Sequence, residues 1–190
     1  RRFSFRRSWL ACALGAVAAL LPALARPATV HGATDATVVW VSVPGAAPAA
    51  GEMAMRNRDR TFVPPFLVVP VGGSVRFPND DPFYHSIYSD SSADPFDIGY
   101  YGTGPGKSVT FSKPGIIDVH CHIHAYMYAT IIVADGPYAQ ADKGSYTLAN
   151  VPAGKHILHA WDADRGERTI AIDVPNADAN VTADIKAPAR

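Results

Sequence analysis

The sequence predicts an all-β protein, in which a β-sandwich is joined to a second, smaller sandwich-like module. No hydrophobic period of 3.6 residues, which would indicate amphipathic helices, runs through the chain after residue 25. Short runs rich in β-branched and aromatic residues occur instead, separated by clusters of Gly, Pro, Asn and Asp. Hydrophobic residues make up 48% of the 190 residues and charged residues 18%, which provides a core and excludes a disordered chain.

The first 25 residues predict an export signal. Four arginines, at positions 1, 2, 6 and 7, precede an apolar run at 9–21, and Ala23-Leu24-Ala25 offers a cleavage site. The apolar run is shorter than the ~20 residues that span a bilayer. We therefore expect a periplasmic protein that is not stably inserted in the membrane once residues 1–25 are removed. The alternative is that this segment stays in place as a membrane anchor.

Charge and cysteine content narrow the possible functions. Without the four arginines of the signal, 13 Lys and Arg face 17 Asp and Glu, and no basic run follows residue 60. We therefore expect no nucleic-acid partner. Of the two cysteines, Cys12 lies in the predicted signal, which leaves Cys121 as the single thiol of the mature protein. In an oxidising compartment an unpaired thiol needs an explanation, and a metal–thiolate bond is a good one.

About ten short runs predict the strands, each bounded by turn residues. They cover residues 37–43, 66–71, 74–77, 86–88, 108–111, 116–121, 129–134, 145–148, 155–161, 169–174 and 181–185. Gly72-Gly73 separates the second run from the third and predicts a hairpin between them. The large aromatic residues are expected in the core, namely Trp40, Trp161, Tyr146 and the phenylalanines at 62, 66, 77 and 111.

A boundary between two modules is predicted near Asp135-Gly136-Pro137, so that the first covers residues 26–136 and the second 137–190. The second contains G-S-Y-T-L-A-N-V-P-A-G-K-H-I-L-H-A-W, which resembles the carboxypeptidase-regulatory, transthyretin-like modules. About 50 residues are few for an independent sandwich. The run at 37–43 is therefore a candidate strand of the second module, in which case the first module is inserted into the second.

One segment concentrates residues with metal chemistry, D-V-H-C-H-I-H-A-Y-M-Y at 118–128. Cys121, His124 and Met127 follow the spacing C-x2-H-x2-M between two predicted strands. Thiolate and thioether favour Cu(I), imidazole accepts both copper states, and one Cys with two His and a weak axial Met forms a blue-copper site. The second histidine must come from elsewhere. His85 is the natural candidate, because it follows a predicted strand and turn.

Residues 62–135 resemble the cupredoxin, or blue copper, family. The upstream part, F-V-P-P-F-L-V-V-P-V-G-G-S-V-R-F-P-N-D-D-P-F-Y-H, resembles the first sheet strands up to the remote histidine ligand. The downstream part, G-K-S-V-T-F-S-K-P-G-I-I-D-V-H-C-H-I-H-A-Y-M-Y-A-T-I-I-V, resembles the last two strands and a compact, amicyanin-like ligand loop. The segment is similar to bacterial plastocyanin-like proteins labelled as methylamine-utilisation proteins. The resemblance implies a Greek-key cupredoxin sandwich that holds one copper per chain with His85, Cys121, His124 and Met127.

The chain departs from the family pattern at two positions. Ser86 follows the first histidine where many members have Asn, whose side chain ties the two ligand loops together. Ala125 follows the second histidine where amicyanin-like loops often have Pro. Ser86 and Asn79 are expected to lie around the ligands, where such neighbours tune a metal site.

Other polar residues receive simpler interpretations. Strand alternation points His120 and His122 away from Cys121, so we expect them to be plain polar residues or a weak surface metal site. Asp80 and Asp81 are expected to be solvated turn residues, since their spacing is not that of a calcium loop. His156 and His159 fall on opposite faces of a predicted strand and are not expected to act together.

Together these residues predict a carrier of single electrons rather than an enzyme. No paired nucleophile and base can be identified, and an axial Met leaves no open catalytic position on copper. The electron would pass through the ring of His124, and Phe83, Ala125 and Tyr126 would form an apolar docking patch for a redox donor and a redox acceptor. Two alternatives stay open: a copper delivery or storage protein, and a structural β protein that the metal only stabilises.

Overall fold

The computed structural model describes residues 28–175 and 179–187. Every regular element in these ranges is a β-strand, from β1 to β17. The predicted fold class, an all-β protein with a β-sandwich and a second sandwich-like module, is confirmed. The predicted signal segment and Cys12 lie outside the described residues. No helix long and apolar enough to cross a membrane occurs in the described ranges.

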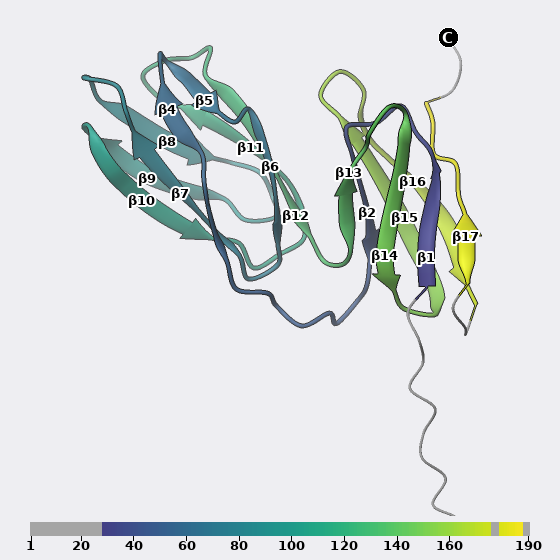
Figure 1. Cartoon of the computed structure of the whole chain (residues 1–190). Helices are drawn as coiled ribbons and strands as arrows, with labels where there is room; N and C mark the ends of the chain where they lie inside the picture. The colour runs from purple at the N-terminus through teal and green to yellow at the C-terminus, as the bar shows by residue number, and fades with distance from the viewer. Residues whose placement is uncertain (1–27, 176–178, 188–190) are drawn as a thin grey trace, which may run out of the picture.

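Four sheets contain all the strands of the described residues (Figure 1). Sheet I has the order β10 (Gly104–Thr110), β7 (Ser74–Asn79), β4 (Arg56–Arg58) and β5 (Thr61–Val63), with β3 (Glu52–Ala54) also paired to β7. Sheet II has the order β6 (Phe66–Pro70), β12 (Tyr128–Ala134), β11 (Gly115–Cys121), β8 (His85–Ser89) and β9 (Phe96–Tyr101). Sheet III has the order β13 (Tyr138–Gln140), β2 (Val38–Ser42), β15 (Gly154–Asp162) and β16 (Gly166–Val174). Sheet IV has the order β14 (Ser145–Val151), β1 (Ala28–Ala33) and β17 (Asn180–Thr182).

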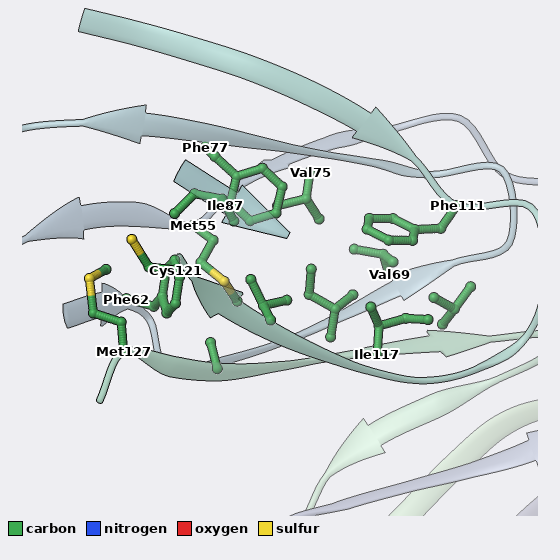
Figure 2. Packing of buried hydrophobic residues seen from close by; sticks show 14 residues of the cluster. Met55, Phe62, Val69, Val75, Phe77, Ile87, Phe111, Ile117, Cys121 and Met127 are labelled. Carbon is green, nitrogen blue, oxygen red and sulfur yellow. The ribbon is translucent and has the colours of Figure 1, made fainter. Parts of the chain in front are cut away.

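The sheets form a stack with a hydrophobic core between each neighbouring pair. Sheets I and II enclose the first core, which includes Phe77, Phe111 and Ile117 (Figure 2). Sheets II and III enclose a smaller core that contains Trp40, Trp161, Val38, Val68, Ile132 and Ala134. Sheets III and IV enclose the third, which contains Tyr146, Leu148 and Leu158 among others. The two sandwiches in Figure 1 therefore also pack against each other, face to face.

Strand β12 shows why the sequence favours this stack. Successive side chains of a strand point to opposite faces. Ile131 and Val133 accordingly enter the core between sheets I and II, while Ile132 and Ala134 enter the core between sheets II and III. A strand that is covered on both faces needs a continuous apolar run, and β12 supplies one from Ala129 to Ala134 apart from the buried Thr130.

The first two strands pair with strands from the other end of the chain. Strand β2 lies between β13 and β15, and β1 lies between β14 and β17. All strands of sheets I and II come from the segment between β2 and β13. The chain thus leaves sheet III once, builds a complete sandwich, and returns to sheet III beside the strand that it left.

The hairpin predicted at Gly72-Gly73 is wrong. Strand β6 pairs in parallel with β12 in sheet II, whereas β7 pairs with β10 in sheet I. The turn carries the chain from one sheet to the other, so that Val69 and Val75 face the same core from opposite sides. Gly72 has the positive φ of 87° that such a turn favours in glycine. The two glycines predicted a turn correctly, but a turn signal alone does not distinguish pairing within a sheet from crossing between sheets.

Six strands were not predicted, namely β1, β3, β4, β5, β9 and β13. Strands β4 and β5 are joined by Asp59-Arg60, with φ values of 53° and 56°. Two-residue hairpin turns with positive φ usually contain glycine. This turn contains none, so no sign of a hairpin can be read from the sequence here. Both strands are short, and each contributes only one buried side chain, Asn57 in β4 and Phe62 in β5.

Candidate metal centre

Two neighbouring strands and one tight loop place the four predicted ligands. Cys121 is the last residue of β11, and His85 is the first residue of β8, the strand paired with β11. His124 and Met127 lie on the loop between β11 and β12. The Met127 N–H donates to the His124 carbonyl at 2.9 Å, which closes this loop into a turn. The C-x2-H-x2-M spacing therefore brings its three side chains to one end of the first sandwich.

Three of these residues converge on one point. The Cys121 Sγ lies 3.7 Å from the His85 Nδ1 and 3.8 Å from the His124 Nδ1. One donor atom from each of the three residues lies within 4.8 Å of the others. His85 and Cys121 are buried, at 0% and 3% exposure, and His124 is partly exposed.

The spacing of the three donor atoms fits a first-row metal ion. Bonds of about 2.3 Å to sulfur and about 2.0 Å to nitrogen separate the two donors by about 3.7 Å in a trigonal site. The sulfur-to-nitrogen distances of 3.7 and 3.8 Å in this chain agree with that value. One thiolate and two imidazoles, with no carboxylate among them, form a set that suits copper rather than magnesium or calcium.

Met127 is the fourth predicted ligand and lies beside Cys121. Its side chain is 1% exposed and belongs to the same core as Cys121. Figure 2 shows both sulfur atoms at the same end of this core, on the side of Phe62 away from Phe111. Met127 therefore lies at the metal end of this core, where its thioether stays the predicted fourth ligand.

The second nitrogen of His85 contacts a carboxylate that the sequence analysis misjudged. The His85 Nε2 lies 3.0 Å from Asp81 Oδ2. Asp81 is 4% exposed, so its interpretation as a solvated turn residue is wrong. The β4–β5 turn folds over it, and the N–H groups of Asp59 and Arg60 donate to its carboxylate at 2.7 and 3.1 Å.

Hydrogen bonds keep the Asp81 carboxyl ionised in this buried place. Burial by itself raises the pKa of Asp81, because it disfavours the charged form. The hydrogen bonds from the Arg60 N–H, His85 and the Asp59 N–H outweigh burial and hold the pKa below its ordinary value. Asp80, the neighbour in sequence, instead faces outward and forms ion pairs with Arg56 and Arg58.

Aromatic residues surround His124 at the surface. The ring of Phe83 lies 5.5 Å from the ring of His85 and 5.7 Å from the ring of His124. The Arg60 guanidinium covers the Phe83 ring, 4.5 Å from its centre. Tyr126 is 68% exposed, with its ring 6.2 Å from His124. Burial lowers the pKa of His124, and the positive charge of Arg60 adds to this effect. The three residues of the predicted docking patch, Phe83, Ala125 and Tyr126, thus lie around His124 or next to it in the chain.

The two other predicted neighbours of the site behave differently from each other. The Ser86 Oγ is buried without a hydrogen-bond partner. The ligand loop is instead tied to β8 through the backbone, because the His122 N–H donates to the Ser86 carbonyl at 2.9 Å. Asn79 spans the turn before His85, where its side chain accepts from the Asp81 N–H and donates to the Phe83 carbonyl.

His120, in β11, and His122, directly after β11, pack against Tyr88 of β8. The ring of Tyr88 stacks on His122 at 3.8 Å and lies 5.6 Å from His120. The His122 Nε2 also lies 3.2 Å from Asp97. Among the residues that the structure describes, neither histidine belongs to a cluster of three metal-binding side chains.

Comparisons with known proteins give copper proteins among the solved structures. No protein-family model and no curated protein matches the chain. A copper-containing nitrite reductase from Thermus scotoductus SA-01 is 30% identical over 46% of this chain, with a TM-score of 0.42, and the chain spans only 25% of its length. A reduced amicyanin mutant and the Cu(I) form of another are 21% and 20% identical over 50% of this chain and 97% of their own, each with a TM-score of 0.41.

Proposed function

We propose that this chain is an exported, periplasmic copper protein that carries single electrons through a blue-copper-like site. His85, Cys121, His124 and Met127 would hold one copper per chain. The observation that carries this proposal is the convergence of the Cys121 Sγ with two imidazole Nδ1 atoms at 3.7 and 3.8 Å in a largely buried setting. A bound copper would supply the change between Cu(I) and Cu(II).

The protein's own residues contribute rigidity. Cys121 and His85 belong to paired strands, and Met127 is packed in the core, so these donors are held before any ion binds. A donor set that keeps its positions needs little rearrangement when one electron is added or removed. This favours a carrier, which must change oxidation state quickly and reversibly.

His124 is the proposed point of electron exchange, because it is the ligand candidate nearest to solvent. Phe83, Ala125 and Tyr126 would contact a redox donor and a redox acceptor in turn. Weak redox encounters use small interfaces, and these three residues around the partly exposed ring of His124 suit such an encounter. The proposal therefore assigns no enzymatic activity to the chain.

The division of the chain is part of the same proposal. Sheets I and II would form the copper module, inserted between β2 and β13 of a transthyretin-like module made by sheets III and IV. The pairing of β1 with β14 and β17, and of β2 with β13 and β15, supports this arrangement.

The test is spectroscopic, on the mature protein loaded with Cu(II). We expect an intense blue band from the thiolate and a narrow copper hyperfine splitting in EPR. Cys121→Ser should abolish both, whereas His122→Ala, which alters the next residue but points away from the site, should retain both. A colourless protein, or a tetragonal copper signal that Cys121→Ser leaves unchanged, would refute the proposal.

A second measurement separates a carrier from a delivery or storage protein. The loaded protein is reduced and reoxidised repeatedly in the presence of a copper chelator. A carrier keeps its copper over many cycles, with the blue band returning each time. Loss of copper to the chelator on the first reduction would instead favour delivery.

A further inference from the structure

We propose that Asp81 is a positioning residue for the metal site, which fixes the ring of His85 with its Nδ1 unprotonated and directed at the site. This inference rests on the proposed function, because it concerns how one of the proposed copper ligands is held. The sequence did not indicate Asp81 as a residue of the metal site.

A neutral imidazole has two nitrogens, of which one carries the proton and the other accepts a hydrogen bond. In His85, Nε2 lies 3.0 Å from Asp81 Oδ2 and Nδ1 lies 3.7 Å from the Cys121 Sγ. Both Asp81 oxygens already accept backbone N–H groups, Oδ1 from Asp59 and Oδ2 from Arg60, so the carboxylate is an acceptor toward His85 as well. The proton of His85 is therefore on Nε2, and the lone pair of Nδ1 is free for a metal ion.

Asp81 is itself held from several sides, which makes it a firm support. Its carboxylate accepts the N–H groups of Asp59 and Arg60 in the β4–β5 turn. Its own N–H donates to the Asn79 side chain, and its carbonyl accepts the hydroxyl of Thr103. The carboxylate is thus fixed by sheet I, while His85 belongs to sheet II, and the bond between them joins the two sheets at the metal end.

The other imidazole of the site lacks such a support. In the part of the chain that the structure describes, no carboxylate is hydrogen-bonded to His124, whose ring is packed against Phe83 and Tyr126. The two histidine rings are therefore held in different ways before a metal ion binds. His85 has a fixed tautomer before metal arrives, whereas packing alone orients His124.

The first test needs neither a variant nor a metal. Long-range proton–nitrogen NMR spectra of the metal-free, nitrogen-15-labelled protein report which nitrogen of each histidine carries the proton. We expect His85 to be the Nε2–H tautomer, with a slowly exchanging Nε2 proton. A His85 protonated on Nδ1 would overturn the inference, whatever the protein does with copper.

The second test compares two neighbouring carboxylates. Asp81→Ala should weaken Co(II) and Cu(II) binding by about 10- to 100-fold, as loss of a hydrogen-bond partner of a metal ligand does, and should allow both tautomers of His85. Asp80→Ala removes the same charge one residue away and should change neither quantity. Equal weakening of metal binding by both substitutions would show that loss of a negative charge alone explains it, and would overturn the inference.

The two proposals can fail separately. A wild-type protein that shows the Nε2–H tautomer but binds no copper would refute the proposed function and leave the role of Asp81 in orienting His85 intact.

Discussion

At the scale of single residues, His85 and Ser86 are both buried, but only the side chain of His85 has polar partners. His85 is fully buried, with one nitrogen near Cys121 and the other on Asp81. Ser86 is also buried, yet its hydroxyl has no hydrogen-bond partner. A buried polar group without a partner costs about 1–3 kcal/mol. Ser86 therefore reduces stability at a place where its backbone already ties β8 to the ligand loop.

Replacing Ser86 should thus be harmless or beneficial. We expect Ser86→Ala to leave the free energy of unfolding of the metal-free protein unchanged or to raise it by up to about 1 kcal/mol, because the lost hydroxyl makes no bond. The matched control is Ser89→Ala on the same strand, since the Ser89 Oγ accepts the Ser91 N–H at 3.2 Å. That substitution should cost about 0.5–1.5 kcal/mol. Denaturant titration measures both, and an equal loss in the two variants would contradict the prediction.

At the scale of elements, strand β14 is attached to the C-terminal segment by a buried tyrosine. The Tyr146 hydroxyl donates to the Ala183 carbonyl at 2.5 Å, and β14 also pairs with β1. Burial, with a smaller contribution from the Asp184 charge, raises the pKa of Tyr146 to about 12. An unfolded tyrosine ionises near 10. The folded state therefore keeps a proton that the unfolded state releases.

This difference predicts a loss of stability in alkaline solution. The contribution of Tyr146 is fully present below pH ~10 and declines as the pH rises toward 12, because the unfolded state gains from ionisation. We expect the stability advantage of the wild type over Tyr146→Phe to shrink by about 1 kcal/mol between pH 8 and pH 11. Denaturant titrations of both proteins at the two pH values measure it. A constant difference would mean that the hydroxyl ionises in the folded protein as easily as in the unfolded one.

At the scale of the whole molecule, the core between sheets II and III joins the two sandwiches into one body. It contains two tryptophans and is continued at its edge by polar contacts, since the Ser42 hydroxyl lies 2.9 Å from both Asp135 and His159. His159 also stacks on Trp40 at 4.7 Å. Such an interface predicts that both sandwiches unfold together.

Adjacent residues of β12 allow this coupling to be tested. Ile132 enters the core between the sandwiches, and Ile131 enters the core of sheets I and II. Each truncation to alanine should cost about 2–5 kcal/mol. In calorimetry we expect one transition for the wild type, two for Ile132→Ala, and a single transition at lower temperature for Ile131→Ala. One transition in the Ile132→Ala protein would show that the sandwiches are coupled by other contacts.

The sequence predicted those parts of the fold and site that depend on local pattern. Alternation and turn residues located most strands, and the C-x2-H-x2-M spacing selected Cys121 and His124, two of the three side chains whose donor atoms meet. Features that depend on distant segments were missed. Asp81 looks solvated in D-D-P because the hairpin that covers it lies some twenty residues upstream and contains no glycine. The crossing at Gly72-Gly73 likewise depends on distant segments, because β7 pairs with β10 on one edge and with β3 and β4 on the other, which leaves no edge for β6.

The pairing of β1 with β17 has a consequence for the order in which the protein forms during synthesis. Thr29 pairs with Asn180, so β1 leaves the ribosome long before its neighbour exists. The strands of sheets I and II all lie between Glu52 and Ala134 and can meet while the remainder is still being translated. The sandwich that contains the candidate metal site can therefore form first. Sheets III and IV must wait for the last strands, and until then β1 and β2 present unpaired edges.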